Sequence, residues 1–243
     1  MSMTILPTLL LAVFILFLAP WDILELRRLR AAPPGAKAAF YIRTSVVLWL
    51  LAGLCLLAYP LAAIWPAPAY AAMLLSDFAW RVIAWVVALL FIGLSWLQMV
   101  QLYRAPPEKR ARALKPFEAM DFFLPGNARE RALFAVVSLS AGICEEVMFR
   151  GFLLRYLVDG HWSVALAAVG SSAIFGLAHA GHGWSGILRT GLLGLFMALL
   201  YLATGSLLVP IAVHACIDLN ALAASALRVK PEAAAAASAT SAA

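Results

Sequence analysis

The sequence contains few charged residues. Asp, Glu, Lys and Arg make up 12% of its 243 residues, about half of the ~25% typical of soluble domains. Hydrophobic residues make up 65%, and a water-soluble fold of this length has too small an interior to bury them. The composition therefore excludes an ordinary soluble domain and indicates that a lipid bilayer surrounds most of the chain.

Cysteine is also scarce. The three cysteines, Cys55, Cys144 and Cys216, fall inside apolar runs, and no CxxC pair is present. This odd number and the missing spacing exclude a disulfide framework or a zinc knuckle. We interpret the cysteines as small buried apolar side chains. Because Cys144 and Cys216 lie beside the charged positions described below, a reactive thiol is the minor alternative.

What the sequence has instead is long apolar runs. A run of about 17–25 apolar residues is long enough to cross a bilayer as a helix. We therefore expect an all-α fold, a polytopic membrane bundle of about seven transmembrane helices. The candidate segments are residues 4–21, 44–64, 78–103, 132–157, 163–180, 186–203 and 206–228. The first has no Lys or Arg before its apolar part and no clear cleavage site, so we expect a retained helix rather than a signal peptide.

Lys and Arg gather mainly in two segments. Five lie within residues 22–43 and seven within residues 104–131, whereas residues 65–77 and 204–205 contain none. Since Lys and Arg concentrate in cytoplasmic loops, we expect a multi-pass membrane protein with its N-terminus outside and its C-terminus cytoplasmic. No nucleic-acid recognition motif accompanies the basic residues. We interpret them as a cytoplasmic face in contact with anionic lipid.

These patterns divide the chain into four parts, and we find no internal repeat. The linker is rich in Pro, Phe and charged residues, which favours a short interfacial helix on the membrane, with a solvated loop as the alternative. The parts are an N-terminal three-helix membrane region at 1–103, a basic cytoplasmic linker at 104–131, a four-helix core at 132–228, and an Ala-rich tail at 229–243.

The run CEEVMFRG places three charges inside an apolar segment. A charge at the bilayer centre costs roughly 2.5–3.5 kcal/mol on insertion scales, so such residues need partners or a function. Arg150 follows Glu146 by four residues, a spacing that brings both side chains to one helix face, where they can pair. Glu145 is rotated by about 100° from Glu146. We therefore expect Glu145 to be free to face a cavity, where a carboxylate can act as a general base.

Two further apolar runs contain ionisable side chains. FGLAHA puts Phe175 and His179 four residues apart, and HACID does the same for His214 and Asp218. A single intramembrane His is most often a packing residue, but ionisable residues on three apolar helices together indicate a functional site. The candidate site residues are Glu145, Glu146, Arg150, His179, His214 and Asp218.

The three runs resemble the motifs of a known family. CEEVMFRG matches EExxxR, FGLAH matches FxxxH, and HACID matches HxxxN/D. Their order and spacing resemble the CAAX-processing and bacteriocin-processing (CPBP) intramembrane proteases, which include the CAAX prenyl endopeptidases. The resemblance covers about residues 130–228, and the first three helices carry no matching motif. One such motif alone is weak, whereas three in order on apolar helices are specific.

The resemblance implies an endopeptidase whose site lies inside the membrane. Glu145 would activate a water molecule, Glu146 would pair with Arg150, and His179 would orient the attacking water. His214 and the polar residue after it would stabilise the oxyanion. That residue is Asp218 here, and an ionised Asp cannot donate a hydrogen bond. Asp218 would therefore be protonated, or would orient His214 instead.

A metal centre is the alternative to this mechanism. Two histidines and carboxylates are a plausible ligand set for a divalent metal such as zinc, here Glu145, His179, His214 and Asp218. HExxH, which places two His ligands on one helix, is missing from the sequence. We favour a metal-free glutamate mechanism with no cofactor.

Other functional classes are weighed against the protease. A proton-coupled transporter also buries Glu, His and Arg, but transporters often contain repeats and broken helices in both halves. A non-catalytic membrane scaffold would tolerate loss of a motif, whereas all three are complete here. The substrate of a protease is left open between a prenylated C-terminus, a peptide precursor and a membrane regulator. No pattern in the sequence sets the oligomeric state.

Overall fold

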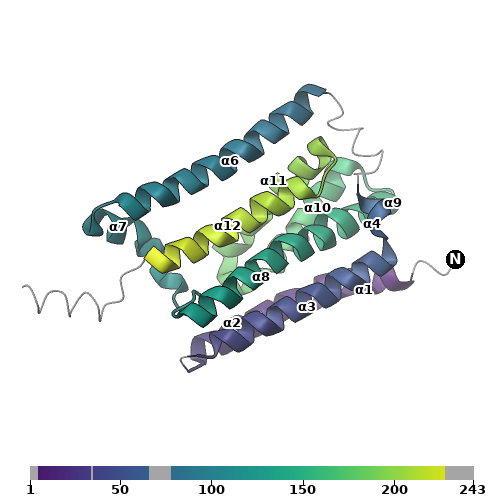
Figure 1. Cartoon of the computed structure of the whole chain (residues 1–243). Helices are drawn as coiled ribbons and strands as arrows, with labels where there is room; N and C mark the ends of the chain where they lie inside the picture. Colours follow the sequence, from purple (N-terminus) through teal and green to yellow (C-terminus); the bar gives the residue numbers. More distant parts are fainter. Residues whose placement is uncertain (1–4, 34, 66–77, 228–243) are drawn as a thin grey trace, which may run out of the picture.

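The computed structural model describes residues 5–33, 35–65 and 78–227, and these residues form helices without strands (Figure 1). This confirms the all-α fold class. In chain order the elements are α1 (Ile5–Leu16), α2 (Leu18–Ala31), α3 (Lys37–Ala58), α4 (Leu61–Ile64), α6 (Phe78–Arg104), α7 (Pro107–Leu114), the 3-10 helix η3 (Lys115–Met120), α8 (Ala128–Glu146), the π-helix η4 (Val147–Leu153), α9 (Leu154–Asp159), α10 (Val164–Leu177), the 3-10 turn η5 (Ala180–His182), α11 (Gly183–Thr204) and α12 (Leu208–Leu227).

Among these residues, five helices are long and apolar enough to cross a membrane, and the pair α1 and α2, bent by 42°, would make a sixth. The expected span at 163–180 contains only the 14-residue helix α10. At 1.5 Å per residue it is about 21 Å long, shorter than the ~30 Å hydrocarbon core. The apolar run had indicated a longer helix because it continues through the turn that ends α10.

The basic segment 22–43 is largely helical rather than a loop. α2 continues to Ala31 because one of its faces packs on the protein, with Leu26 buried there. Glu25 on this helix is also buried, and it pairs with Arg28 and with Arg43 of α3. A buried carboxylate with two basic partners ties α2 to α3 at the basic end of the bundle.

The linker 104–131 contains the short helices α7 and η3, and its Phe-rich part packs onto the bundle. The ring of Phe123 lies 5.5 Å from that of Phe134 and 6.3 Å from that of Tyr41, whose hydroxyl donates to the Phe123 carbonyl. α8 then begins at Ala128, and its N-cap is Asn127, whose Oδ1 accepts the Glu130 amide at 2.9 Å. The predicted loop at 65–77, beyond its first residue, and the tail at 229–243 lie outside the described residues.

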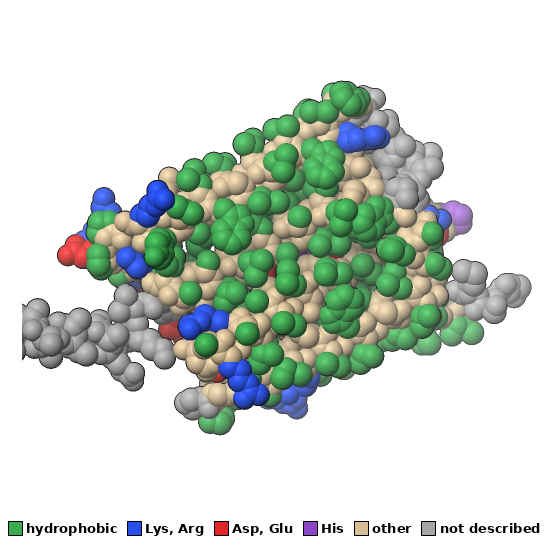
Figure 2. Space-filling view, in the orientation of Figure 1, with side chains coloured by type: hydrophobic (Ala, Val, Ile, Leu, Met, Phe, Trp, Pro, Cys, Tyr) green, Lys and Arg blue, Asp and Glu red, His purple; other side chains and the backbone are tan. Residues whose placement is uncertain are grey.

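The outer surface suits a lipid environment. Hydrophobic side chains cover most of the face in Figure 2, and Lys and Arg gather mainly at the end formed by α7, the close of α2 and the start of α3. α6 exposes Trp80, Trp85 and Trp96 by 44–49%. Such large apolar side chains on a helix of high hydropathy face lipid rather than water.

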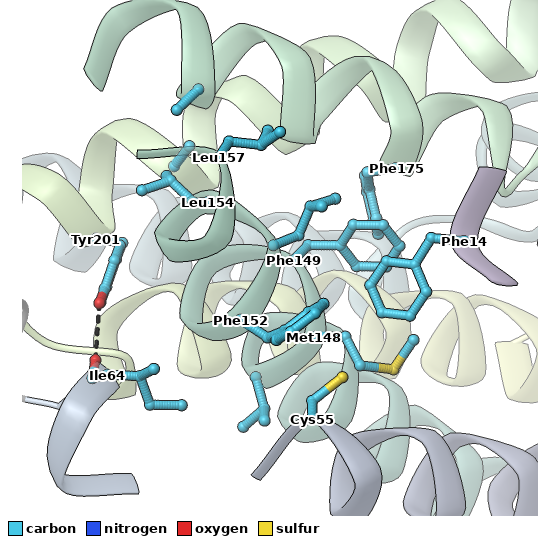
Figure 3. Close-up of a cluster of buried hydrophobic side chains, with 14 of the residues drawn as sticks. Phe14, Cys55, Ile64, Met148, Phe149, Phe152, Leu154, Leu157, Phe175 and Tyr201 are labelled. Carbon is cyan, nitrogen blue, oxygen red and sulfur yellow. Dashed lines mark hydrogen bonds between the residues drawn. The ribbon is translucent and has the colours of Figure 1, made fainter. Parts of the chain in front are cut away.

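The core joins the N-terminal helices to the later ones. Phe14 of α1 lies 5.3 Å from Phe149 of η4, and Phe149 lies 4.9 Å from Phe175 of α10, between ring centroids (Figure 3). The hydroxyl of Tyr201 on α11 donates to the Ile64 carbonyl at 2.7 Å. Buried residues of α8, η4, α10 and α11 belong to this apolar cluster, whereas the buried apolar residues of α12 pack in a second cluster with α6 and α11.

Candidate active site

The two adjacent glutamates stand where α8 changes its winding. α8 ends at Glu146, and the next seven residues, Val147–Leu153, form a π-helix that contains Arg150. π-turns inside helices are frequent at functional sites. Arg150 Nη1 donates to Glu146 Oε1 at 2.9 Å, and both side chains are fully buried. The ion pair predicted from the four-residue spacing is present, although the backbone between the two residues is not a regular α-helix.

Arg150 is enclosed by two further contacts. Its Nη2 donates to the Gly194 carbonyl of α11 at 2.8 Å, and its guanidinium carbon lies 4.6 Å from the centroid of the Phe175 ring. A Cβ at Gly194 would approach Phe175 Cδ1 to 2.9 Å and Arg150 Nη2 to 3.2 Å. α11 therefore needs glycine at this position for Arg150 to reach its carbonyl.

Glu146 also holds His214. His214 Nδ1 lies 2.8 Å from Glu146 Oε1, and both side chains are buried. Because an ionised carboxylate only accepts, we assign the proton of this bond to Nδ1, which leaves Nε2 to face the site. The residue that orients His214 is thus Glu146 rather than Asp218.

Asp218 lies beside the site without a bond to it. The side chain is half-buried and interacts electrostatically with His214, Glu145 and His179. It takes part in none of the hydrogen bonds or ion pairs that the described ranges contain.

His179 lies just beyond the end of α10. Its Nδ1 is 2.9 Å from the Phe175 carbonyl oxygen. A carbonyl can only accept, so we assign the proton to Nδ1, and Nε2 of the neutral ring is then an acceptor. The Phe175 ring stands edge-on to the imidazole, with 4.7 Å between centroids. Phe175 thus fixes His179 through both its backbone and its side chain.

Glu145 lies between the two histidines. Its Oε2 is 3.9 Å from His179 Nε2 and 3.8 Å from His214 Nε2. This oxygen is buried and has no hydrogen-bond partner within residues 5–33, 35–65 and 78–227. The distances exceed those of direct hydrogen bonds and suit a bridging water. The side chain of Glu145 is 14% exposed and that of His179 is 25% exposed, so the group is accessible at one edge.

The metal alternative requires several ligands to converge on one point. Within the described parts of the chain, no group of three or more His, Cys, Asp and Glu side chains comes together in a way that could hold a metal ion.

One contact to the site comes from a helix in which the sequence shows no motif. Asp22 Oδ2 of α2 accepts the Gly181 amide at 2.7 Å, two residues beyond His179. The only sequence cue was an acidic residue at the edge of the first apolar run. Its partner is 159 residues away, a distance that no local pattern can bridge.

Comparison with known families agrees with these motifs. The family model described as "Rce1-like: Type II CAAX prenyl endopeptidase Rce1-like" matches residues 127–220. Residues 127–220 of this chain are therefore similar to the type II CAAX prenyl endopeptidases. The match begins at the N-cap of α8, ends within α12 and contains all three motifs. No curated protein and no solved structure matches the chain.

The family match confirms the resemblance drawn from the motifs. Together with the apolar helices, the match supports an integral membrane protein. Helices α1 to α6 precede the matched segment.

Proposed function

We propose that this chain is an intramembrane endopeptidase that hydrolyses a peptide bond in a membrane-associated substrate, with Glu145 as the general base. The observation that supports this is the position of Glu145 Oε2. It is buried, it lacks a hydrogen-bond partner among the described residues, and it lies 3.8–3.9 Å from the Nε2 atoms of two histidines. A water molecule held there would touch a base and an acceptor at once.

In the first step Glu145 and His179 bind the water. One water hydrogen points to Glu145 Oε2 and the other to His179 Nε2, whose ring is held by the Phe175 carbonyl at Nδ1. Glu145 takes a proton as the water oxygen bonds to the substrate carbonyl carbon. The electron pair of the C=O bond moves to oxygen and forms an oxyanion.

His214 is the proposed oxyanion donor. When the ring carries both protons, Nδ1–H remains bonded to Glu146 and Nε2–H is available to the oxyanion. The oxyanion then re-forms the C=O bond, and the C–N bond breaks with its electron pair on nitrogen. The proton from Glu145 passes to that nitrogen, which leaves as an amine, while the other product is a carboxylic acid that then loses its proton to water. No metal takes part in this sequence.

Glu146 and Arg150 keep this geometry in place. One carboxylate oxygen accepts from both Arg150 and His214, which joins α8 to α12. Arg150 in turn holds α11 through Gly194. We assign these two residues to positioning, since their side chains are fully buried and do not reach a substrate.

The first substrate class to test is a CAAX peptide, because the description of the matched family model names CAAX prenyl endopeptidases. We also infer that the basic end of the bundle is cytoplasmic. The two basic segments meet at this end (Figure 1), and Lys and Arg favour the cytoplasmic side. This would put the N-terminus outside.

The test uses the purified chain in lipid nanodiscs with two internally quenched peptides of one CAAX sequence, one farnesylated and one unmodified. Cleavage is run in water enriched in oxygen-18. Hydrolysis predicts one solvent oxygen in the new carboxyl terminus, seen by mass spectrometry. No cleavage of either peptide, together with no altered protein termini in membranes of producing cells compared with cells making Glu145→Gln, would overturn the proposal.

A further inference from the structure

α2 holds the turn that follows His179. Asp22 Oδ2 accepts the Gly181 amide at 2.7 Å, and Arg30 Nη2 donates to the Gly181 carbonyl at 3.4 Å. Asp22, Leu26 and Arg30 recur every four residues, so they lie on one face of α2. The amide and the carbonyl of Gly181 in η5 are thus both hydrogen-bonded to side chains of α2.

The approach of α2 to η5 leaves no space for a side chain. A Cβ at Gly181 would lie 2.7 Å from Leu26 Cδ1, 2.8 Å from Asp22 Oδ2 and 2.9 Å from the Asp22 carbonyl oxygen. The last of these is backbone and cannot move aside without shifting α2. Glycine at 181 is therefore what allows the helix and the turn to bond directly.

The turn in question sets the position of His179. α10 ends at Leu177, and His179 has φ −107° and ψ 27°, outside the helical range. Its amide donates to Gly176 and its carbonyl accepts from His182, so its backbone is bonded to α10 on one side and to η5 on the other. α10 alone therefore does not fix the direction of the His179 side chain.

We propose that Asp22 is a positioning residue for His179, and that through it α2 forms part of the catalytic site. The Asp22–Gly181 hydrogen bond anchors η5, and η5 keeps His179 Nε2 facing Glu145. This inference rests on the proposed function for the role of His179. It adds a residue from outside the segment that matches the family model, residues 127–220.

Three variants separate the effect of the Asp22–Gly181 hydrogen bond from the effects of the Asp22 charge and of the stability of α2. Asp22→Ala removes the acceptor, whereas Asp22→Asn keeps an acceptor oxygen and removes only the charge. Glu25→Gln is the matched control, because Glu25 lies on the same helix and is buried, but bonds to Arg28 and Arg43 and not to η5. This variant weakens the ion pairs that hold α2 and leaves the hydrogen bonds to Gly181 in place.

The first readout does not depend on activity. Hydrogen–deuterium exchange of the full chain in nanodiscs is followed in peptides covering residues 178–184. Asp22→Ala is expected to speed exchange there about tenfold, because the Gly181 amide loses its acceptor and the turn opens locally. Asp22→Asn and Glu25→Gln are expected to exchange as the parent does in these peptides.

The second readout is cleavage of the CAAX peptide that the parent cleaves. Asp22→Ala is expected to lower kcat by roughly tenfold to a hundredfold with KM unchanged, since small displacements of a catalytic group cost rates of that order. Asp22→Asn is expected to restore kcat to near the parent value. If Asp22→Ala acted only by a general loss of fold, Asp22→Asn would not restore kcat. Glu25→Gln would then lower kcat as well.

Three results would overturn the inference: unchanged exchange and kcat in Asp22→Ala, equal losses in Asp22→Asn and Asp22→Ala, or equally fast exchange at 178–184 in Glu25→Gln. If the parent cleaves neither peptide, it is the proposed function that fails. The exchange data alone then decide whether Asp22 fixes the turn that carries His179.

Discussion

Glu146 and His214 are joined by a hydrogen bond of 2.8 Å between Oε1 and Nδ1, and the same oxygen accepts from Arg150 at 2.9 Å. A single buried carboxylate therefore joins two cations or potential cations from two helices. It fixes which nitrogen of His214 faces the site. It also explains why the two adjacent glutamates differ: Glu146 is bonded inside the protein, while Glu145 Oε2 is not.

Arg150→Ala is expected to destabilise the protein by about 3–5 kcal/mol, because it leaves Glu146 buried without its guanidinium partner. Arg155→Ala is the matched comparison. Arg155 also pairs with an acid four residues away, Asp159, but that pair is partly exposed, so its loss is expected to cost about 1 kcal/mol or less. Thermal unfolding in detergent measures both. Equal stability of the two variants would show that the buried pair is not needed.

Gly194→Ala is expected to lower both thermal stability and activity. The new methyl group would press on Phe175 and on the Arg150 guanidinium. The Phe175 ring also contacts the imidazole of His179, so a shift of Phe175 would displace His179. Gly93→Ala on α6 is the control, since nothing lies within 4 Å of a Cβ there and Ala favours a helix over Gly. If Gly194→Ala matches Gly93→Ala in melting temperature and rate, the close packing around Arg150 is not required.

Asp218→Asn tests the metal alternative. In the metal-free mechanism an amide can donate to the oxyanion where an ionised carboxylate cannot, so the variant is expected to keep or raise activity. Chelators are expected to leave the parent active. Elemental analysis of active protein is the measurement. A stoichiometric metal in the parent, lost together with activity in Asp218→Asn, would replace the metal-free mechanism with a metal-dependent one.

Lys109→Cys tests the orientation of the bundle. The three native cysteines are buried, whereas Lys109 is exposed on α7, so a single accessible thiol is created. A membrane-impermeant maleimide is expected to label it in opened membranes and not in intact cells. Labelling in intact cells would place the basic end outside and reverse the inferred topology.

The sequence predicted the features that depend on local spacing. The four-residue step from Glu146 to Arg150 gave their ion pair, and the apolar runs gave the all-α membrane fold. The matched family segment was predicted from the motifs, at about 130–228 compared with 127–220. These patterns work because helix geometry links sequence distance directly to direction in space.

The features that the sequence did not predict depend on contacts between distant segments. Glu146 and His214 are 68 residues apart, and Asp22 and Gly181 are 159 apart. No spacing rule connects such pairs, since the packing of α8 on α12 and of α2 on η5 decides them. The π-helix after Glu146 and the short length of α10 were missed for a related reason: an apolar run does not reveal where tertiary packing changes or ends a helix.

The central claim is that Glu145 is the base, and cleavage by Glu145→Gln tests it most directly. Among the residues that the structure describes, Glu145 has no partner of opposite charge closer than the two histidines, so the variant is expected to insert and to melt within a few degrees of the parent. Glu118→Gln, at an exposed carboxylate of η3, is the control for charge removal alone. Both are assayed on the peptide that the parent cleaves, in the same nanodiscs.

The account predicts that Glu145→Gln loses at least about 10²-fold in kcat, the usual contribution of a general base, while Glu118→Gln cleaves as the parent does. A folded Glu145→Gln protein that retains most of the parent kcat would contradict the account.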